Sequence, residues 1–177
     1  MTVRRVVTGK SGGKSVIVSD GGTRRAKVFK HIPGQSAALI WSTPATPTLP
    51  IDGADVISEK STYLPLQPGE TRLEIVTFAP NSVMMSIDPA AAFGEFAEHL
   101  PDLAATMEPD SPGMHTTQSV DYGIVLEGDL WLEVDDGKEV HLKPHDVVVQ
   151  NGTRHAWRNK GDKPVKVAFV LIGAKKS

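Results

Sequence analysis

Short runs rich in apolar residues follow one another through the second half of the chain. They cover residues 122–126, 130–134, 139–142, 146–150, 155–158 and 165–172. Between them stand Gly, Asn, Asp and Pro residues, which supply tight-turn backbone. Runs of this length with such turns between them are typical of strands. The spacing therefore predicts an antiparallel barrel or sandwich.

Two further strands are expected earlier, at residues 72–79 and 82–87, on either side of the turn Pro80-Asn81. The first alternates apolar with polar side chains, Leu73 and Ile75 against Arg72 and Glu74. A period of two is expected of a strand that has one apolar and one polar face. The two strands would complete the barrel.

One helix is expected, at residues 89–99. Asp88 is a suitable N-cap, and Pro89 fits the first helical turn. Three apolar residues then recur at helical spacing: Phe93, Phe96 and Leu100. This face is predicted to pack on the barrel.

The N-terminal region has four short predicted strands, at residues 4–7, 15–19, 26–29 and 37–41. Four such strands make a poor core by themselves. We therefore divide the chain into an N-terminal extension, residues 1–64, and a barrel, residues 65–177. The extension is expected to add strands to the sheets or to reach the interface with a partner subunit.

Composition limits the possible chemistry. The chain has 177 residues, 40% of them hydrophobic, which suffices for the core of one domain. A formal net charge of −2 gives no extended basic surface, so nucleic acid is not an expected partner. Cysteine is absent, which excludes thiolate metal ligands and a cysteine nucleophile. Without an apolar run of ~18 residues or a signal peptide, a cytoplasmic protein without membrane contact is expected.

A polar stripe occurs where a strand core should be apolar. Residues two apart on a strand share a face, so His115, Thr117, Ser119 and Asp121 can point into one interior. His155 is expected to approach them from a neighbouring strand. Buried polar groups need partners, which a metal ion, a bound ligand or internal waters would supply.

Two segments of the chain resemble the paired motifs of the cupin superfamily. The first motif reads His-x-His, three or four residues, Glu, six residues and Gly in that family. His115 and Gly128 match it, whereas Thr117 replaces the second His and Asp121 replaces the Glu. Two of the four usual metal positions are therefore altered.

The second motif ends in Pro-x-Gly-x-x-His-x-x-x-Asn in the family. Gly152, His155 and Asn159 keep this spacing, while Gln150 replaces the Pro. His145 also stands where the family has a turn Gly. The resemblance covers about residues 70 to 173.

The resemblance implies an all-β fold, the double-stranded β-helix or cupin jelly-roll barrel, with N-terminal extra strands and one short helix. The chain looks most like small single-barrel cupins of the cupin 2 type from bacteria and fungi. Some of these accompany pathways for aromatic or polyketide compounds, which implies a small oxygenated organic substrate. Cupins commonly dimerise, so a homodimer is expected.

Three functions stay open. In the first, His115, Asp121 and His155 bind one divalent metal (Fe, Mn, Ni or Zn), and the chain is an oxygenase or a metal-assisted isomerase or lyase. In the second, there is no metal, and the same His and Asp act as general acid and base, with Thr117 and Tyr122 as hydrogen-bond donors. The third is a non-catalytic module that binds a small molecule.

The predicted site residues follow from these hypotheses. The catalytic residues are His115, His155, Thr117 and Tyr122. The substrate contacts are Thr117, Ser119 and Trp157, and Trp157 shares the face of His155 because it lies two residues further on.

Overall fold

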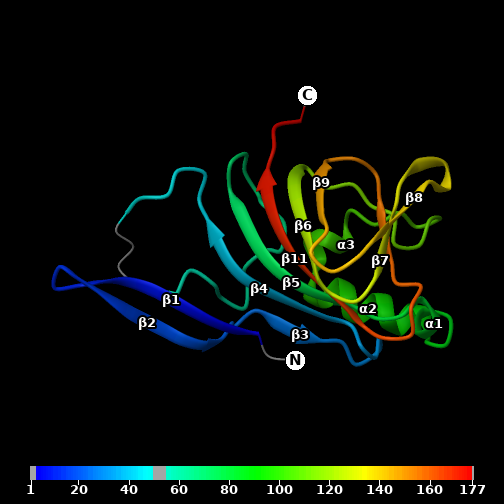
Figure 1. Cartoon of the computed structure of the whole chain (residues 1–177), viewed down its shortest axis with the longest axis horizontal. Coiled ribbons are helices and arrows are strands. Elements are labelled where there is room, and N and C mark those ends of the chain that lie inside the picture. Colours follow the sequence, from blue (N-terminus) through cyan, green and yellow to red (C-terminus); the bar gives the residue numbers. More distant parts are fainter. Residues whose placement is uncertain (1–2, 50–54, 177) are drawn as a thin grey trace.

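Antiparallel strands build two sheets that pack on each other (Figure 1). This computed structural model describes residues 3–49 and 55–176. The larger sheet has six strands in the order β3-β4-β5-β11-β6-β9, and the smaller has three in the order β10-β7-β8. The strands are β1 (Arg4–Ser11), β2 (Lys14–Gly22), β3 (Ala26–Val28), β4 (Ser36–Thr43), β5 (Thr71–Phe78), β6 (Ser119–Glu127), β7 (Leu130–Glu133), β8 (Glu139–Leu142), β9 (Val147–Asn151), β10 (Ala156–Arg158) and β11 (Val165–Gly173). The helices are α1 (Asn81–Met84), α2 (Pro89–His99) and α3 (Pro101–Ala104), with a 3-10 turn at Asp135–Gly137.

An apolar core lies between the two sheets. Its buried members are Val125, Leu130, Leu142, Val165, Val167, Phe169 and Leu171. Leu130 and Leu142 come from the smaller sheet, and the others from β6 and β11 of the larger. Burying side chains of this size is worth about 1.5–3 kcal/mol each. The core therefore holds the sheets face to face, and the predicted all-β barrel class is confirmed.

Helix α2 begins and ends at the predicted residues. Asp88 caps it by accepting two backbone N–H hydrogen bonds. Phe96 and Leu100 pack in a second core together with Phe29, whereas Phe93 is 53% exposed. The predicted packing is confirmed for two of the three apolar residues.

Residues 82–87 are not a strand, which corrects the sequence prediction. The Val83 N–H donates to Pro80 O at 3.0 Å, and the Ser86 N–H donates to Val83 O at 2.9 Å. These local bonds form α1 in place of a strand ladder. Met85 is 89% exposed, although a strand would put it on the same face as Val83, which packs against the second core. With α3, the described residues hold more helical turns than the single predicted helix. No helix in that described part has the length and apolar character needed to cross a membrane.

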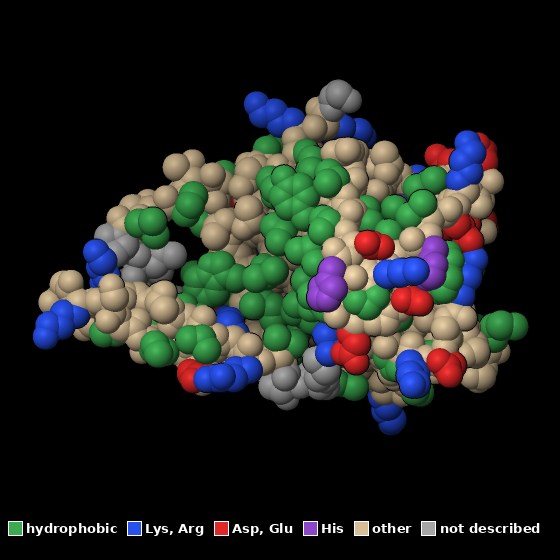
Figure 2. Space-filling view, in the orientation of Figure 1, with side chains coloured by type: hydrophobic (Ala, Val, Ile, Leu, Met, Phe, Trp, Pro, Cys, Tyr) green, Lys and Arg blue, Asp and Glu red, His purple; other side chains and the backbone are tan. Residues whose placement is uncertain are grey.

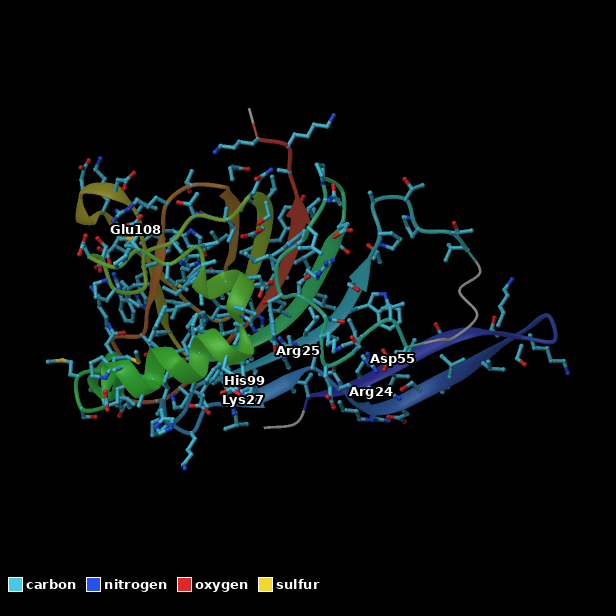
Figure 3. All side chains as sticks on the ribbon, turned by 180° about the vertical axis from the view of Figure 1, so that it is seen from behind. Arg24, Arg25, Lys27, Asp55, His99 and Glu108 are labelled. Atoms are coloured by element: carbon cyan, nitrogen blue, oxygen red, sulfur yellow. The ribbon has the colours of Figure 1, made fainter. Side chains whose placement is uncertain are left out.

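The N-terminal region contributes both to the larger sheet and to a separate hairpin. β3 pairs with β4, which pairs with β5. The β1–β2 hairpin stands off to one side (Figure 1). Arg5 anchors it, because its guanidinium donates to Ile40 O at 3.3 Å and to the carboxylate of Asp55, which Figure 3 labels. The boundary between the extension (residues 1–64) and the barrel (residues 65–177) stays a prediction. Residues 1–2, 50–54 and 177 of these ranges lie outside the described residues.

A strap, residues 62–69, closes the barrel end at which β11 finishes. The Gly69 N–H donates to Gly173 O at 2.8 Å, and Leu64 packs against the core between the sheets. A Cβ added to Gly173 would meet Gln67 O at 2.2 Å. Glycine is needed there because the strap crosses the strand in direct contact.

The first half of β5 is polar on its inner face and apolar on its outer face. Arg72 and Glu74 are only 7% and 5% exposed, while Leu73 and Ile75 lie on the opposite face. The polar members of the predicted alternation are therefore the buried ones.

The outer face of the larger sheet carries exposed apolar side chains. Tyr122 on β6 pairs with Val149 on β9, and Ile124 pairs with Val147. Tyr122, Val147 and Val149 are 41%, 60% and 56% exposed. Figure 2 shows hydrophobic side chains gathered on this side of the molecule.

Candidate functional site

The polar stripe predicted from the sequence faces the barrel interior. Thr117, Ser119 and Asp121 are 4%, 2% and 6% exposed and alternate with more exposed neighbours. β6 begins at Ser119, and His115 lies just before it, joined to His155 by two backbone hydrogen bonds of 3.0 Å. The local alternation therefore brings these residues to the interior together.

His115 and His155 form a buried pair of imidazoles. Their ring centroids are 4.3 Å apart. The Nδ1 atom of His115 lies 3.0 Å from Gly113 O, and that of His155 lies 2.9 Å from Thr153 O. Burial lowers the pKa of His115. Burial together with the charge of His115 lowers the pKa of His155 to about 4. Both imidazoles are therefore neutral at pH 7.

Gln150 lies between the imidazole pair and the carboxylate of Asp121. It stands opposite Asp121 in the β6–β9 ladder and is 4% exposed. Its Nε2 atom lies 2.7 Å from His155 Nδ1 and also donates to Thr153 O at 2.7 Å. Because Gln150 occupies the family's Pro position, this substitution places an amide beside the imidazole.

Asp121 lies in a different environment from the histidines. Its Oδ2 atom accepts a hydrogen bond from the Thr117 hydroxyl at 3.3 Å, while Oδ1 is buried without a partner in the described part of the chain. Burial raises the pKa of Asp121, and the hydroxyls of Ser119 and Thr117 oppose this in part.

The structure adds no support for the predicted metal site of His115, Asp121 and His155, which stays a prediction. Within residues 3–49 and 55–176, no group of three or more His, Asp or Glu side chains lies close enough to hold a metal ion. The two altered motif positions reduce the set of possible ligands, because Thr117 offers no imidazole and Asp121 is one methylene shorter than the family's Glu. The two imidazoles alone do not provide the three protein ligands of a typical catalytic centre.

Trp157 and Tyr122 lie on opposite sides of the barrel wall. Trp157 packs edge-on to His155, with ring centroids 5.6 Å apart, and contacts Phe169 at 5.3 Å. It therefore lines the interior beside the imidazole pair. Tyr122 points to the outer face, because it neighbours Asp121 on the strand, so its assignment as a donor inside the site is wrong.

Two interior residues were missed by the sequence prediction of the site. Glu74 and Arg72 face inward from β5, and the Oε1 atom of Glu74 has no hydrogen-bond partner among the described residues. Burial raises the pKa of Glu74 well above its usual range, and the charges of Asp102 and Asp121 add to this. The alternation was visible in the sequence, but it did not show which face lies inside.

A cavity of about 260 Å³ lies near the outward-facing residues of the second motif. Arg154 and Arg158 line it. Arg154 pairs with Glu108, labelled in Figure 3, and Arg158 pairs with Glu133, at 2.7 and 2.6 Å. Because both guanidinium groups are paired with carboxylates, this cavity is not a built anion site.

Comparison with known proteins identifies the domain. Residues 104–172 match the family model of the Cupin_2 cupin domain. A segment of 63 residues is 46% identical to phomopsin biosynthesis cluster protein C' of Diaporthe leptostromiformis, covering 35% of this chain and 33% of that protein. Over 98% of this chain and 77% of the relative, identity is 29% to the cupin-domain-containing oxidoreductase virC of Hypocrea virens.

Solved structures give a weaker similarity. The chain aligns with AerE from Microcystis aeruginosa at 16% identity and a TM-score of 0.45, covering 85% of this chain and 46% of that one. Together, the motifs, the barrel and the family match show a cupin domain at residues 104–172. The chain spans about a third of the length of the first curated relatives that it matches.

Proposed function

We propose that this cupin is an enzyme that moves a proton on a small oxygenated organic molecule, in an isomerisation, dehydration or lyase step. His155 and His115 are the candidate bases, and Asp121 is the candidate acid at the other side of Gln150. The observation that supports this most directly is the buried pair of neutral imidazoles beside an interior carboxyl group.

The opposite pKa shifts suit proton transfer. Burial lowers the pKa of His155 to about 4 and raises that of Asp121 above its usual range. The pKa values of the two groups are therefore shifted in opposite directions from their ordinary values, and perturbed pKa values of this kind cluster at functional sites. Thr117, which donates to Asp121, holds the carboxyl group in place.

Deuterium incorporation from solvent tests this function. The protein is incubated in D₂O with a panel of hydroxylated aromatic and polyketide-like compounds, and mass gain at carbon is followed by mass spectrometry. We expect a compound whose exchange is catalysed, and a loss of roughly 100-fold or more in its rate in His155→Ala. His31→Ala, an exposed histidine, is the control and should keep the wild-type rate.

Two results would contradict the proposal. One is exchange that persists at the wild-type rate in His155→Ala. The other is turnover of a panel compound with no solvent deuterium in the product.

A second candidate function is oxidation of the substrate by dioxygen, because the names of several relatives state oxidoreductase. It is distinguished by oxygen uptake. The protein with a panel compound would consume dioxygen in proportion to product, measured with and without added Fe(II). Turnover under strict anaerobic conditions would rule this candidate out.

The chain is also proposed to act as a homodimer. The exposed apolar row formed by Tyr122, Val147 and Val149 is a flat surface that a second copy can match about a two-fold axis. Light scattering after size-exclusion chromatography should give twice the chain mass. Val149→Lys should give the single mass, and Val140→Lys, on the smaller sheet, is the control. A single mass for the wild type would contradict this.

A further inference from the structure

Three polar atoms inside the barrel lack partners. Ser119 Oγ, Asp121 Oδ1 and Glu74 Oε1 are buried, and none makes a hydrogen bond of ordinary geometry among the described residues, although the Ser119 hydroxyl lies near enough to the Asp121 carboxylate to lower its pKa. The exposed fractions of these residues are 2%, 6% and 5%. Burying a polar atom without a partner costs free energy comparable to a lost hydrogen bond. Three such atoms point to a bound molecule that supplies the partners.

The register places the two carboxyl groups on one inner surface. Glu74 stands opposite Phe169 on β11, and Asp121 stands opposite Leu171 on the other edge of the same strand. Phe169 and Leu171 are two residues apart and share the inner face. Glu74 and Asp121 therefore face the interior with one strand between them.

Arg72 does not neutralise these carboxyl groups. Its guanidinium donates to Thr62 O at 3.1 Å, to Thr71 O at 2.9 Å and to the Glu70 carboxylate at 3.2 Å. The N–H groups of Arg72 therefore point to the strap and to the residues at the start of β5. Glu74 is left without a bonded cation in the described structure, although Arg72 lies on the same strand face.

The charges around Glu74 favour its neutral form. Burial raises its pKa well above the usual range, the carboxyls of Asp102 and Asp121 add to this, and Arg72 opposes it in part. The nearby hydroxyl of Tyr63 also has a raised pKa, mainly through burial. Glu74 therefore keeps its proton at pH values where an ordinary glutamate is ionised, and its O–H group can donate.

An aromatic wall adjoins these atoms. Gly123 lies two residues beyond Asp121 on the same inner face, and a Cβ placed there would meet Phe169 Cε1 at 3.0 Å and Trp157 Cη2 at 3.5 Å. The interior thus combines aromatic ring surfaces with buried polar atoms that lack hydrogen-bond partners. A separate cavity of about 70 Å³ lies at the seam between the strap and the end of β11, where Gln67, Gln118 and Gly173 line it.

We propose that Glu74, Ser119 and Asp121 form a ligand site inside the barrel for an uncharged molecule with hydroxyl or carbonyl groups. Glu74 donates a hydrogen bond to a ligand oxygen, while Ser119 and Asp121 bind a second polar group. An anionic ligand is disfavoured because the site offers carboxyl groups and no unpaired cation among the described residues. This inference rests on the proposed small-molecule function and names the chemical class of its substrate.

Equilibrium binding of two probes tests the site. Catechol is an uncharged ring with two hydroxyl groups, and benzoate is an anion of similar size. Each is titrated into ¹⁵N-labelled protein and followed by amide shifts. We expect catechol to shift residues 119–123 and 74, and benzoate to bind roughly tenfold more weakly or worse.

Two variants of Glu74 separate a ligand contact from a structural role. Glu74→Met keeps the length of the side chain but removes its polar atoms, so catechol affinity should fall roughly tenfold while the melting temperature stays level or rises. Glu74→Gln retains a donor and should keep the affinity within about threefold. Glu98→Met, at a side chain 75% exposed, is the matched control.

Three results would overturn the site. They are wild-type catechol affinity in Glu74→Met, benzoate binding as tight as that of catechol, and the absence of interior shifts with either probe. Binding is measured without turnover, so the result does not depend on the deuterium exchange assay. Loss of exchange in His155→Ala with unchanged binding in Glu74→Met would leave the proposed function standing and remove only this site.

Discussion

The low pKa of His155 makes folding stability depend on pH. Burial and the charge of His115 lower that pKa to about 4 in the folded protein, whereas an unfolded chain has ~6.5. Between these values the folded protein binds fewer protons than the unfolded chain. The stabilisation that the neutral His155 contributes is therefore fully present above pH ~6.5, and it is lost as the pH falls toward the pKa of His155 in the folded protein.

The magnitude follows from the two pKa values. Each unit by which the pH falls within this window lowers the free energy of unfolding by up to about 1.4 kcal/mol. The total loss across the window is about 3 kcal/mol. For a chain of this size, that loss corresponds to a fall of about 6–12 °C in melting temperature. His155 is 2% exposed, so solvent screening takes little from this value.

Unfolding by heat and by urea from pH 4 to pH 8 measures this effect. His155→Gln removes the titrating group, and its melting temperature should fall less steeply than that of the wild type as the pH is lowered. His115 contributes with the same sign in both proteins, because burial lowers its pKa too. His31→Gln should keep the wild-type slope. Equal slopes for the wild type and His155→Gln would refute the reasoning.

Three further predictions concern stability, each measured by urea unfolding. The raised pKa of Glu74 means that this residue contributes a loss of stability as the pH rises from ~4.3 through its folded pKa, by up to about 1.4 kcal/mol per pH unit, so the stability of Glu74→Gln relative to the wild type should rise over this range. His145 has a left-handed backbone (φ 76°), so His145→Gly should raise the free energy of unfolding at pH 7 by about 0.5–1 kcal/mol, and an unchanged or lower value would contradict this. Asp55→Asn leaves the 6% exposed Arg5 without its carboxylate and should cost about 2–3 kcal/mol, whereas Asp20→Asn, in an exposed ion pair, should cause no measurable change.

Most of the fold could be predicted because its signals are local. Turn residues and apolar runs marked the strands of the barrel, and the capping residue Asp88 with Pro89 marked the start of α2. The strand predicted at residues 82–87 was wrong because a short, mostly apolar segment does not distinguish a strand from a helical turn. What formed α1 was a set of local hydrogen bonds that the pattern does not encode.

The candidate site could be predicted only in part. The stripe from His115 to Asp121 faces the interior because alternation along one strand is a local property. Tyr122 was misplaced although the same alternation puts it outside. Whether the interior residues act in catalysis stays a prediction.

The sequence by itself indicated the cupin barrel, because the motif glycines, turns and apolar runs specify it locally. It also determined which residues share a face of each strand. Only the tertiary structure decided that Arg72 and Glu74 lie inside, because a period of two does not say which face of a strand meets the core. Only the pairing of β6 with β9 placed Gln150 opposite Asp121 and beside His155. Contacts between strands depend on register across the sheet, and the order of residues along one chain does not fix that.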